Sequence, residues 1–121
     1  MYRILKKESV PFEYENKTYI LTQAFIPTVD CWEHRYGKFR PRKSTVASIT
    51  YTPDFVCPDG TWVMEVKGRA NEIFPMRWKL FRAYVETLEK KPLLLLVSNE
   101  KDAMIAVEEI RKRSEQDGHY Q

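Results

Sequence analysis

The sequence predicts an α/β domain in which a mixed β-sheet is flanked by two α-helices. A change of pattern along the chain indicates this class. Apolar and polar residues alternate through much of the first half, as in strands with one covered face, whereas after Gly68 apolar residues recur every three or four positions, as on one side of a helix. The chain has 121 residues, of which 43 % are apolar, so we expect one domain spanning residues 1–121 with a single packed core.

The first strands are expected between residues 11 and 25. Two short alternating runs, 11–15 and 18–25, lie on either side of Asn16-Lys17 and predict a β-hairpin. Residues 26–44 follow no consistent period and contain two prolines and a glycine, so we expect a long basic loop there. Loops of this length in a small domain are usually functional or mobile.

A second hairpin is expected further along the chain. The β-branched run Thr45–Val56 and the run Thr61–Lys67 flank the sequence Pro58-Asp59-Gly60. Proline presets φ at the start of a turn and glycine accepts a positive φ at its end, so this sequence predicts a tight connection between two strands.

Two helices with a strand between them are expected after Gly68. The first helix is closed by Pro92, Leu93–Val97 is predicted to be a strand buried on both faces, and the last helix is expected from about Lys101 to Ser114. The core-facing residues of the first helix are expected to be Phe74, Trp78, Phe81, Val85 and Leu88, and those of the last helix Ala103, Ala106, Val107 and Ile110.

Composition and charge exclude few functions. Lys and Arg number 20 and Asp and Glu 17, and the resulting net charge of +3 permits nucleic-acid binding without requiring it. The N-terminus has no apolar signal segment, and the run Leu93–Val97 is far shorter than the roughly 20 residues of a membrane span. Two cysteines are too few for a disulfide framework and suit a reducing compartment. We therefore expect a soluble, cytoplasmic protein.

Three charged residues of the second hairpin form the candidate catalytic site. If Asp59-Gly60 is a two-residue loop, Asp54 lies directly across from Glu65, with the two Cβ atoms roughly 4.5–5.5 Å apart. Side chains alternate across a strand, so Lys67 falls on the same face as Glu65. The opposite face is expected to be the core, with Phe55, Cys57, Trp62, Met64 and Val66.

Two opposed carboxylates destabilise a hairpin unless something compensates, and a divalent cation does so directly. Asp54 and Glu65, with the Val66 carbonyl, therefore predict an oxygen site for Mg²⁺, which would acidify a bound water and neutralise charge on a phosphate. Lys67 would orient that water or stabilise the transition state. One alternative stays open: an ordinary surface hairpin with solvated charges, favoured if a three-residue loop sets Asp54 opposite Met64.

The same segment resembles a known enzyme family. Pro53-Asp54, then ten residues, then Glu65-Val66-Lys67 resembles the PD-(D/E)XK nuclease signature, in which Asp and Glu hold Mg²⁺ and Lys assists phosphodiester hydrolysis. Together with Phe12–Glu15 and Tyr51–Phe55, the segment is similar to the phage endonuclease I group of Holliday-junction resolvases and to related phage nuclease-like proteins. The resemblance covers about residues 10–98 and is strongest over 49–68.

The resemblance implies a restriction-endonuclease-like fold and a Mg²⁺-dependent DNA endonuclease in which Mn²⁺ can substitute for Mg²⁺. It also implies branched or double-stranded DNA as the substrate, and the cytoplasm of a bacterial or phage-infected cell as the location. Such nucleases usually carry a further acid on a helix before the first strand, and Glu8 is the sole acid before Phe12. Glu8 could fill that role, or Glu13, Glu15 or a partner subunit of a homodimer could do so, or the site could have fewer ligands.

Basic residues predict where DNA would bind. Aromatic side chains interleave with cations over residues 32–43, which suits phosphate contacts and stacking on unpaired bases. The opposing interpretation is a solvated loop whose Trp32 and Phe39 tuck into the core. The candidate DNA-binding residues are Arg35, Lys38, Arg40, Arg42, Lys43 and Arg69. Besides the endonuclease, two alternatives remain: a catalytically impaired nuclease-fold DNA-binding or assembly subunit, and a protein-interaction domain.

Overall fold

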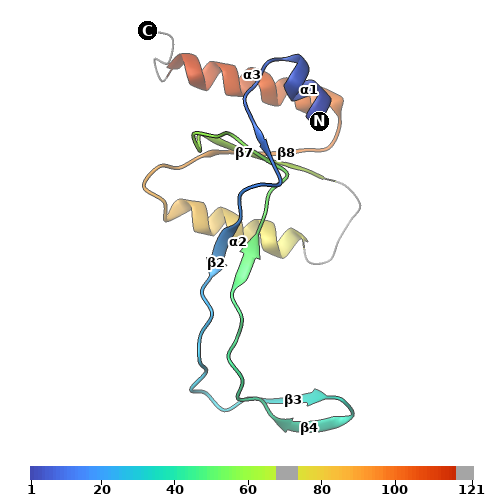
Figure 1. The fold of residues 1–121 in the computed structure, drawn as a ribbon, viewed down its shortest axis with the longest axis vertical. Helices are drawn as coiled ribbons and strands as arrows, with labels where there is room; N and C mark the ends of the chain where they lie inside the picture. Colours follow the sequence, from blue (N-terminus) through green and yellow to red (C-terminus); the bar gives the residue numbers. More distant parts are fainter. Residues whose placement is uncertain (68–73, 117–121) are drawn as a thin grey trace. The chain divides into compact units, whose positions relative to one another are not determined.

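The computed structural model describes residues 1–67 and 74–116, which form an α/β protein with a mixed sheet (Figure 1). By their internal contacts the residues group into two compact units, which we call the sheet unit (Met1–Thr18 with Thr52–Gln121) and the ribbon unit (Tyr19–Tyr51). The elements in chain order are α1 (Tyr2–Lys7), β1 (Glu13–Tyr14), β2 (Tyr19–Thr22), β3 (Trp32–Arg35), β4 (Lys38–Pro41), β5 (Ile49–Tyr51), β6 (Phe55–Val56), β7 (Trp62–Val66), α2 (Phe74–Glu86), β8 (Leu93–Val97) and α3 (Glu100–Gln116).

The sheet unit contains a four-stranded sheet in the order β1-β6-β7-β8. β6 runs antiparallel to both β1 and β7, and β8 runs parallel to β7, so the expected mixed sheet is present. Helices cover both of its faces, with α1 and α3 on one side of β7 and β8 and α2 on the other (Figure 1). The two expected long helices are thus confirmed, and α1 is an additional short one.

Side chains on both faces of the sheet are buried. On the α3 side, the core cluster contains Leu5, Val10, Phe55, Trp62, Met64, Val97, Ala106, Val107 and Ile110. Val56 and Val63 point the opposite way, because side chains alternate along β6 and β7, and they are 2 % and 0 % exposed. The prediction of one apolar and one charged face is therefore wrong: the second face also buries apolar side chains, and α2, with Phe81 and Val85 buried, lies on that side of the sheet.

The expected hairpin over residues 11–25 is also wrong. β1 pairs with β6, and β2 pairs with β5, so neither strand pairs with the other. Residues 13–25 instead run antiparallel to residues 46–56, with an isolated bridge between Phe25 and Val46 continuing this pairing. The alternation correctly indicated strands, but it carries no information on which distant segment each strand pairs with.

Residues 26–44, expected to be a long loop, contain a second hairpin in the ribbon unit. β3 and β4 pair from Trp32↔Pro41 to Arg35↔Lys38, and Tyr36 and Gly37 form the connection with φ values of 54° and 77°. A two-residue turn with both φ values positive is of type I′, whose twist matches that of the strands it joins. The usual sequence signal for such a turn, Asn-Gly or Asp-Gly, is replaced here by Tyr-Gly, so the sequence does not predict this hairpin.

Strand β8 differs from the expectation in its position. It lies at the edge of the sheet beside β7 and is only partly buried, with Leu96 39 % exposed. The sequence predicted a strand buried on both faces, and the family resemblance implies a central one. α2 ends at Glu86, before the expected stop at Pro92. In the described part of the chain no helix has the length and apolar character needed to span a membrane.

Candidate functional site

The β6–β7 hairpin has the register that the sequence predicted. Phe55 pairs with Met64 and Val56 with Val63, and the Cys57 N–H donates to the Trp62 carbonyl at 3.0 Å. The connection is the four residues 58–61 instead of two, but this length leaves the register unchanged. Asp54 and Glu65 therefore occupy opposite positions, as expected.

Asp59 holds this connection in shape. Its Oδ1 accepts hydrogen bonds from the Thr61 N–H at 3.0 Å and the Thr61 hydroxyl at 2.7 Å, and the Lys90 ammonium donates to its backbone carbonyl at 2.8 Å. A hydrogen bond from the Cys57 thiol, with those from Thr61, lowers the pKa of Asp59 to about 2. Gly60 takes a φ of 79°, so the turn uses the residue that tolerates this conformation best.

The carboxylates of Asp54 and Glu65 each accept a backbone hydrogen bond from across the hairpin. The Val66 N–H donates to Asp54 Oδ2 at 2.8 Å, and the Asp54 N–H donates to Glu65 Oε1 at 3.1 Å. Both side chains are half-buried, so these bonds fix the orientation of each carboxylate. A carboxylate oxygen has more than one lone pair, and accepting one N–H therefore leaves it able to bind a cation.

The Val66 carbonyl is placed to serve as a third oxygen. In an antiparallel ladder, hydrogen-bonded residue pairs alternate with pairs that are not hydrogen-bonded. Cys57 and Trp62 form a hydrogen-bonded pair, so residues 53 and 66, four positions further along each strand, occupy hydrogen-bonded positions near the carboxylates. Residue 53 is a buried proline, which has no N–H to donate to the Val66 carbonyl. Proline at this position thus removes the competing strand donor.

Lys67 directly follows β7. Its N–H donates to the Val97 carbonyl at 2.8 Å, which continues the β7–β8 pairing by one residue. The side chain is exposed, and strand alternation places it on the face of Glu65. Two carboxylates and an ammonium group therefore share one face at the end of the β6–β7 hairpin.

The structure separates the three candidates for an additional acid. Glu8 accepts a hydrogen bond from the Arg111 guanidinium at 3.1 Å, on the α3 side of the sheet. Glu13, in contrast, lies in β1 and pairs with Val56, and Glu15 directly follows β1, where its N–H donates to the Asp54 carbonyl at 2.9 Å.

Tyr14 lies close to two of the acids, Glu15 and Asp54. A hydrogen bond to Glu15 and the negative charges of Glu15 and Asp54 raise the pKa of Tyr14. Over residues 1–67 and 74–116, no group of three or more His, Cys, Asp or Glu residues is arranged to hold a metal. The oxygen set argued above is consistent with that result, because it consists of two carboxylates and a backbone carbonyl.

The β3–β4 hairpin separates its cations from its aromatic rings. Residues opposite each other in an antiparallel pair share a face, and the pairing continues from β3–β4 to Cys31 and Arg42, where the Arg42 N–H donates to the Cys31 carbonyl at 2.7 Å. We call one side the basic face, which carries Glu33 as its acid; its cations are Arg35, Lys38, Arg40 and Arg42. The other side, the aromatic face, consists of Trp32, His34, Phe39 and Pro41.

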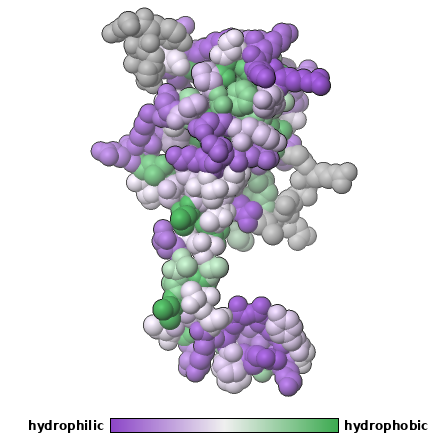
Figure 2. All heavy atoms as spheres, in the orientation of Figure 1, coloured by the Kyte–Doolittle hydropathy of each residue, from purple (hydrophilic) through white to green (hydrophobic). Residues whose placement is uncertain are grey.

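The exposures of the aromatic rings bear on one of the alternatives above. Trp32 is 55 % and Phe39 67 % exposed, so the interpretation in which both tuck into the core is wrong. Lys43 follows β4 and is also exposed. Arg69, the remaining candidate DNA contact, lies outside the described residues. Figure 2 shows the surface of the β3–β4 hairpin as mainly hydrophilic.

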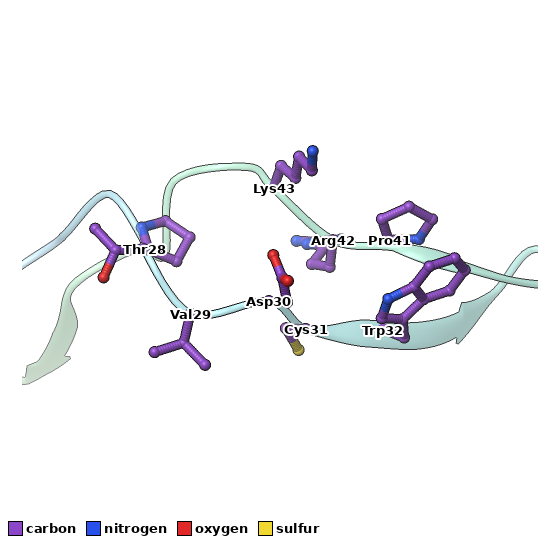
Figure 3. A pocket seen from close by; sticks show the side chains of 9 residues that line it. Thr28, Val29, Asp30, Cys31, Trp32, Pro41, Arg42 and Lys43 are labelled. Carbon is purple, nitrogen blue, oxygen red and sulfur yellow. The ribbon is translucent and has the colours of Figure 1, made fainter.

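A pocket of about 430 Å³ lies at the base of the β3–β4 hairpin, within the ribbon unit (Figure 3). Arg42 and Lys43 lie on one side of it, the Asp30 carboxylate points toward them, and Trp32 lies at its end. Its lining is completed by Pro27, Thr28, Val29, Cys31 and Pro41. The sequence gave no signal for this pocket, because its walls come from segments whose pairing was not predicted.

Comparison of the chain with protein-family models, curated proteins and solved structures finds no match. The function of the site must therefore be inferred from its own geometry. Sequence reasoning located the two carboxylates and Lys67, but it missed the two-faced character of β3–β4 and the pairing of Glu8 with Arg111. The alternate positions of Trp32 and His34 are a sequence signal for the aromatic face, whereas Phe39 joins that face only through the strand pairing.

Proposed function

We propose that the protein is a metal-dependent DNA endonuclease of the PD-(D/E)XK type, which hydrolyses phosphodiester bonds with Mg²⁺ as its cofactor. The observation that carries the proposal is that the carboxylates of Asp54 and Glu65 each accept a backbone N–H from across the hairpin. These bonds orient two half-buried carboxylates at opposite positions, with Lys67 two residues beyond Glu65. Two like charges held at opposite positions of a hairpin favour a divalent cation between them.

The arrangement of the sheet unit supports a restriction-endonuclease-like fold. The hairpin that carries Asp54 and Glu65 lies inside a mixed sheet with helices on both faces, and α2 follows it in sequence and covers the face that bears the carboxylates. β8 then pairs in parallel with the strand of Glu65 and Lys67. These features agree with the fold that the sequence resemblance implies, apart from the edge position of β8.

The residues at this site fit a hard divalent cation, with oxygen ligands from Asp54, Glu65 and the Val66 carbonyl. Such an ion supplies charge neutralisation at the scissile phosphate and lowers the pKa of a bound water. The backbone hydrogen bonds hold both carboxylates in place before substrate arrives, so little reorganisation is needed. The Lys67 ammonium, on the same face, stabilises negative charge that develops on the phosphate or orients the attacking water.

Branched or otherwise structured DNA is the proposed substrate class, on the basis of the resemblance, and a homodimer is the proposed assembly. Support from the structure itself is electrostatic: four cations share the basic face of β3–β4, and Lys43 follows directly. Each phosphate neutralised by such a cation contributes a salt-dependent share of the affinity.

One observation favours a second candidate function. Glu8, the sole acid before the first strand, is paired with Arg111 on the α3 side, so it is not beside Asp54. A site that requires this acid would be inactive, and the protein would then act as a nuclease-fold DNA-binding or assembly subunit. In the endonuclease, Glu13, Glu15 or a partner subunit would supply the additional carboxylate, or the site would have fewer ligands.

Cleavage assays distinguish the two functions. A four-way junction, a fork and a linear duplex are incubated with Mg²⁺ or Mn²⁺ and wild type, Asp54→Asn, Lys67→Met, or the control Lys101→Ala, which removes an exposed ammonium from α3. We expect wild type and the control to cut at least one substrate and both site variants to lose at least 100-fold in rate. If no substrate is cut, while DNA is bound equally by wild type and Asp54→Asn and equally with and without EDTA, the non-catalytic function is correct.

A further inference from the structure

The two faces of the β3–β4 hairpin offer two different kinds of contact. The basic face presents guanidinium and ammonium groups, which bind phosphates irrespective of sequence. The aromatic face presents the rings of Trp32 and Phe39, with centroids 5.6 Å apart, and His34 beside them.

The exposed rings need a partner. A two-stranded hairpin has no second layer in which to bury them, and such hairpins are marginally stable alone. Rings exposed by more than half, set beside a basic surface, indicate a ligand with both flat apolar surfaces and negative charge. Nucleic acid has both, because each base is a flat π-system linked to a phosphate.

Building on the proposed function, we propose that the β3–β4 hairpin selects DNA whose bases are exposed over continuous duplex DNA. The basic face binds the phosphates of either kind of DNA. The aromatic face gains stacking only where a base has lost its neighbour, as at a fork, flap, bulge or junction, because the faces of bases inside a duplex are already stacked.

The pocket at the base of the hairpin supports this selection. Trp32 and Pro41 end the aromatic face at the pocket, and Arg42 and Lys43 line the same cavity (Figure 3). Its volume of about 430 Å³ lies within the range of about 300–1,000 Å³ that is usual for small-molecule sites. An unpaired nucleotide can thus place its base against Trp32 and its phosphate beside the two cations, with the Asp30 carboxylate as an acceptor for an exocyclic amine.

The size of the effect follows from stacking. Alanine substitution of a stacking ring usually lowers affinity by roughly 5- to 150-fold for each base. A phosphate contact behaves differently, since its loss weakens binding to every DNA and lowers the slope of affinity against salt by about one unit. The two faces are therefore expected to give distinguishable signatures.

The test measures binding in EDTA, at fixed salt, to a fork and to a duplex of equal length. We expect wild type to prefer the fork by at least 5-fold. Phe39→Leu and Trp32→Leu keep apolar volume but remove a ring, and we expect them to lose this preference while duplex affinity stays within twofold. Arg40→Gln and Lys38→Gln, the matched controls from the basic face, should weaken binding to both DNAs.

A second measurement needs no variant. A fork carrying 2-aminopurine at an unpaired position should lose fluorescence when wild type binds, because the base stacks on a ring, whereas a duplex-embedded 2-aminopurine should change little. Equal affinity of wild type for fork and duplex, or an unquenched fork, would overturn the inference. Since no step requires cleavage, these results are independent of the loss of cleavage in Asp54→Asn, which tests the proposed function.

Discussion

In the absence of metal, repulsion between the opposed carboxylates should lower the free energy of unfolding relative to a variant that lacks one of the two charges. Asp54→Asn keeps an amide oxygen that can accept the Val66 N–H at the position of Asp54 Oδ2, but it removes one of two like charges. If the charges are as far apart as the Cβ atoms of opposed residues usually are, about 5 Å, the repulsion amounts to about 1 kcal/mol in a water-like dielectric and about 3 kcal/mol near a protein surface. We therefore expect Asp54→Asn to be more stable than wild type in EDTA, by about 1 kcal/mol or more.

Divalent metal should reverse this order. A ligand that binds only the folded state at ten times its Kd stabilises that state by about 1.4 kcal/mol, and wild type alone should show this gain. The assay is urea unfolding at pH 7, followed by fluorescence of the buried Trp62, in EDTA and in Mg²⁺ or Mn²⁺ at matched ionic strength. Asp54→Ala serves as the control for the hydrogen bond, because it removes the acceptor as well and should fall about 1–2 kcal/mol below Asp54→Asn.

The reasoning fails on either of two results. If Asp54→Asn and Asp54→Ala are equally destabilised in EDTA, the carboxylates do not repel each other enough to matter and the Val66 hydrogen bond depends on the charge of Asp54. If wild type and Asp54→Asn gain the same stability from metal, the ion binds elsewhere. A Glu89→Gln variant, which removes an exposed acid in the segment after α2, should behave as wild type in both conditions.

Three further predictions concern the same hairpin. Pro53→Ala adds an N–H opposite the Val66 carbonyl, so we expect metal affinity by calorimetry to fall, with folding stability unchanged or raised; unchanged affinity would remove that carbonyl from the site. The pKa of Asp59 is lowered from 3.8 to about 2, so its contribution to the free energy of unfolding is complete above pH 3.8 and is lost as the pH falls toward 2. Because Asp59 is exposed, we expect the loss, measured by urea unfolding, to be at most about 1 kcal/mol. The Asp59→Ala variant should lack this pH dependence. Gly60→Ala meets no neighbouring atom within 4 Å, so it should cost only the backbone penalty of about 1–2 kcal/mol, and a neutral result would show that the turn relaxes.

The parts of the fold that could be predicted depend on local sequence. The Pro58-Asp59-Gly60 turn fixed the register of β6 and β7, and hence the opposition of Asp54 and Glu65, even though the loop proved longer than expected. The stripes of α2 and α3 follow from a 3.6-residue period, which a short window reveals.

The parts that could not be predicted depend on distant contacts. A period of two assigns each residue of β1 and β2 to a face, but it cannot show that these strands pair with β6 and β5. The contact between Glu8 and Arg111 joins the two ends of the chain, and no spacing rule covers it. The β3–β4 turn is a local exception, because the pairing of its own two strands holds Tyr36 at a positive φ that a non-glycine residue disfavours.

The local rules that this sequence breaks are concentrated at the two surfaces proposed for function. Asp54 faces Glu65 across a hairpin, Pro53 interrupts a ladder, and the rings of the aromatic face are left in solvent; each of these features costs stability. The surrounding structure offsets the first two, because Val63 and the other side chains next to the carboxylates are fully packed and Asp59 fixes the turn that joins their strands. No comparable scaffold lies under the aromatic face, so its cost is relieved only when a ligand covers it. A rigid pair of carboxylates and an adaptable aromatic surface are what a nuclease needs if one part of the chain performs chemistry and another part selects the DNA.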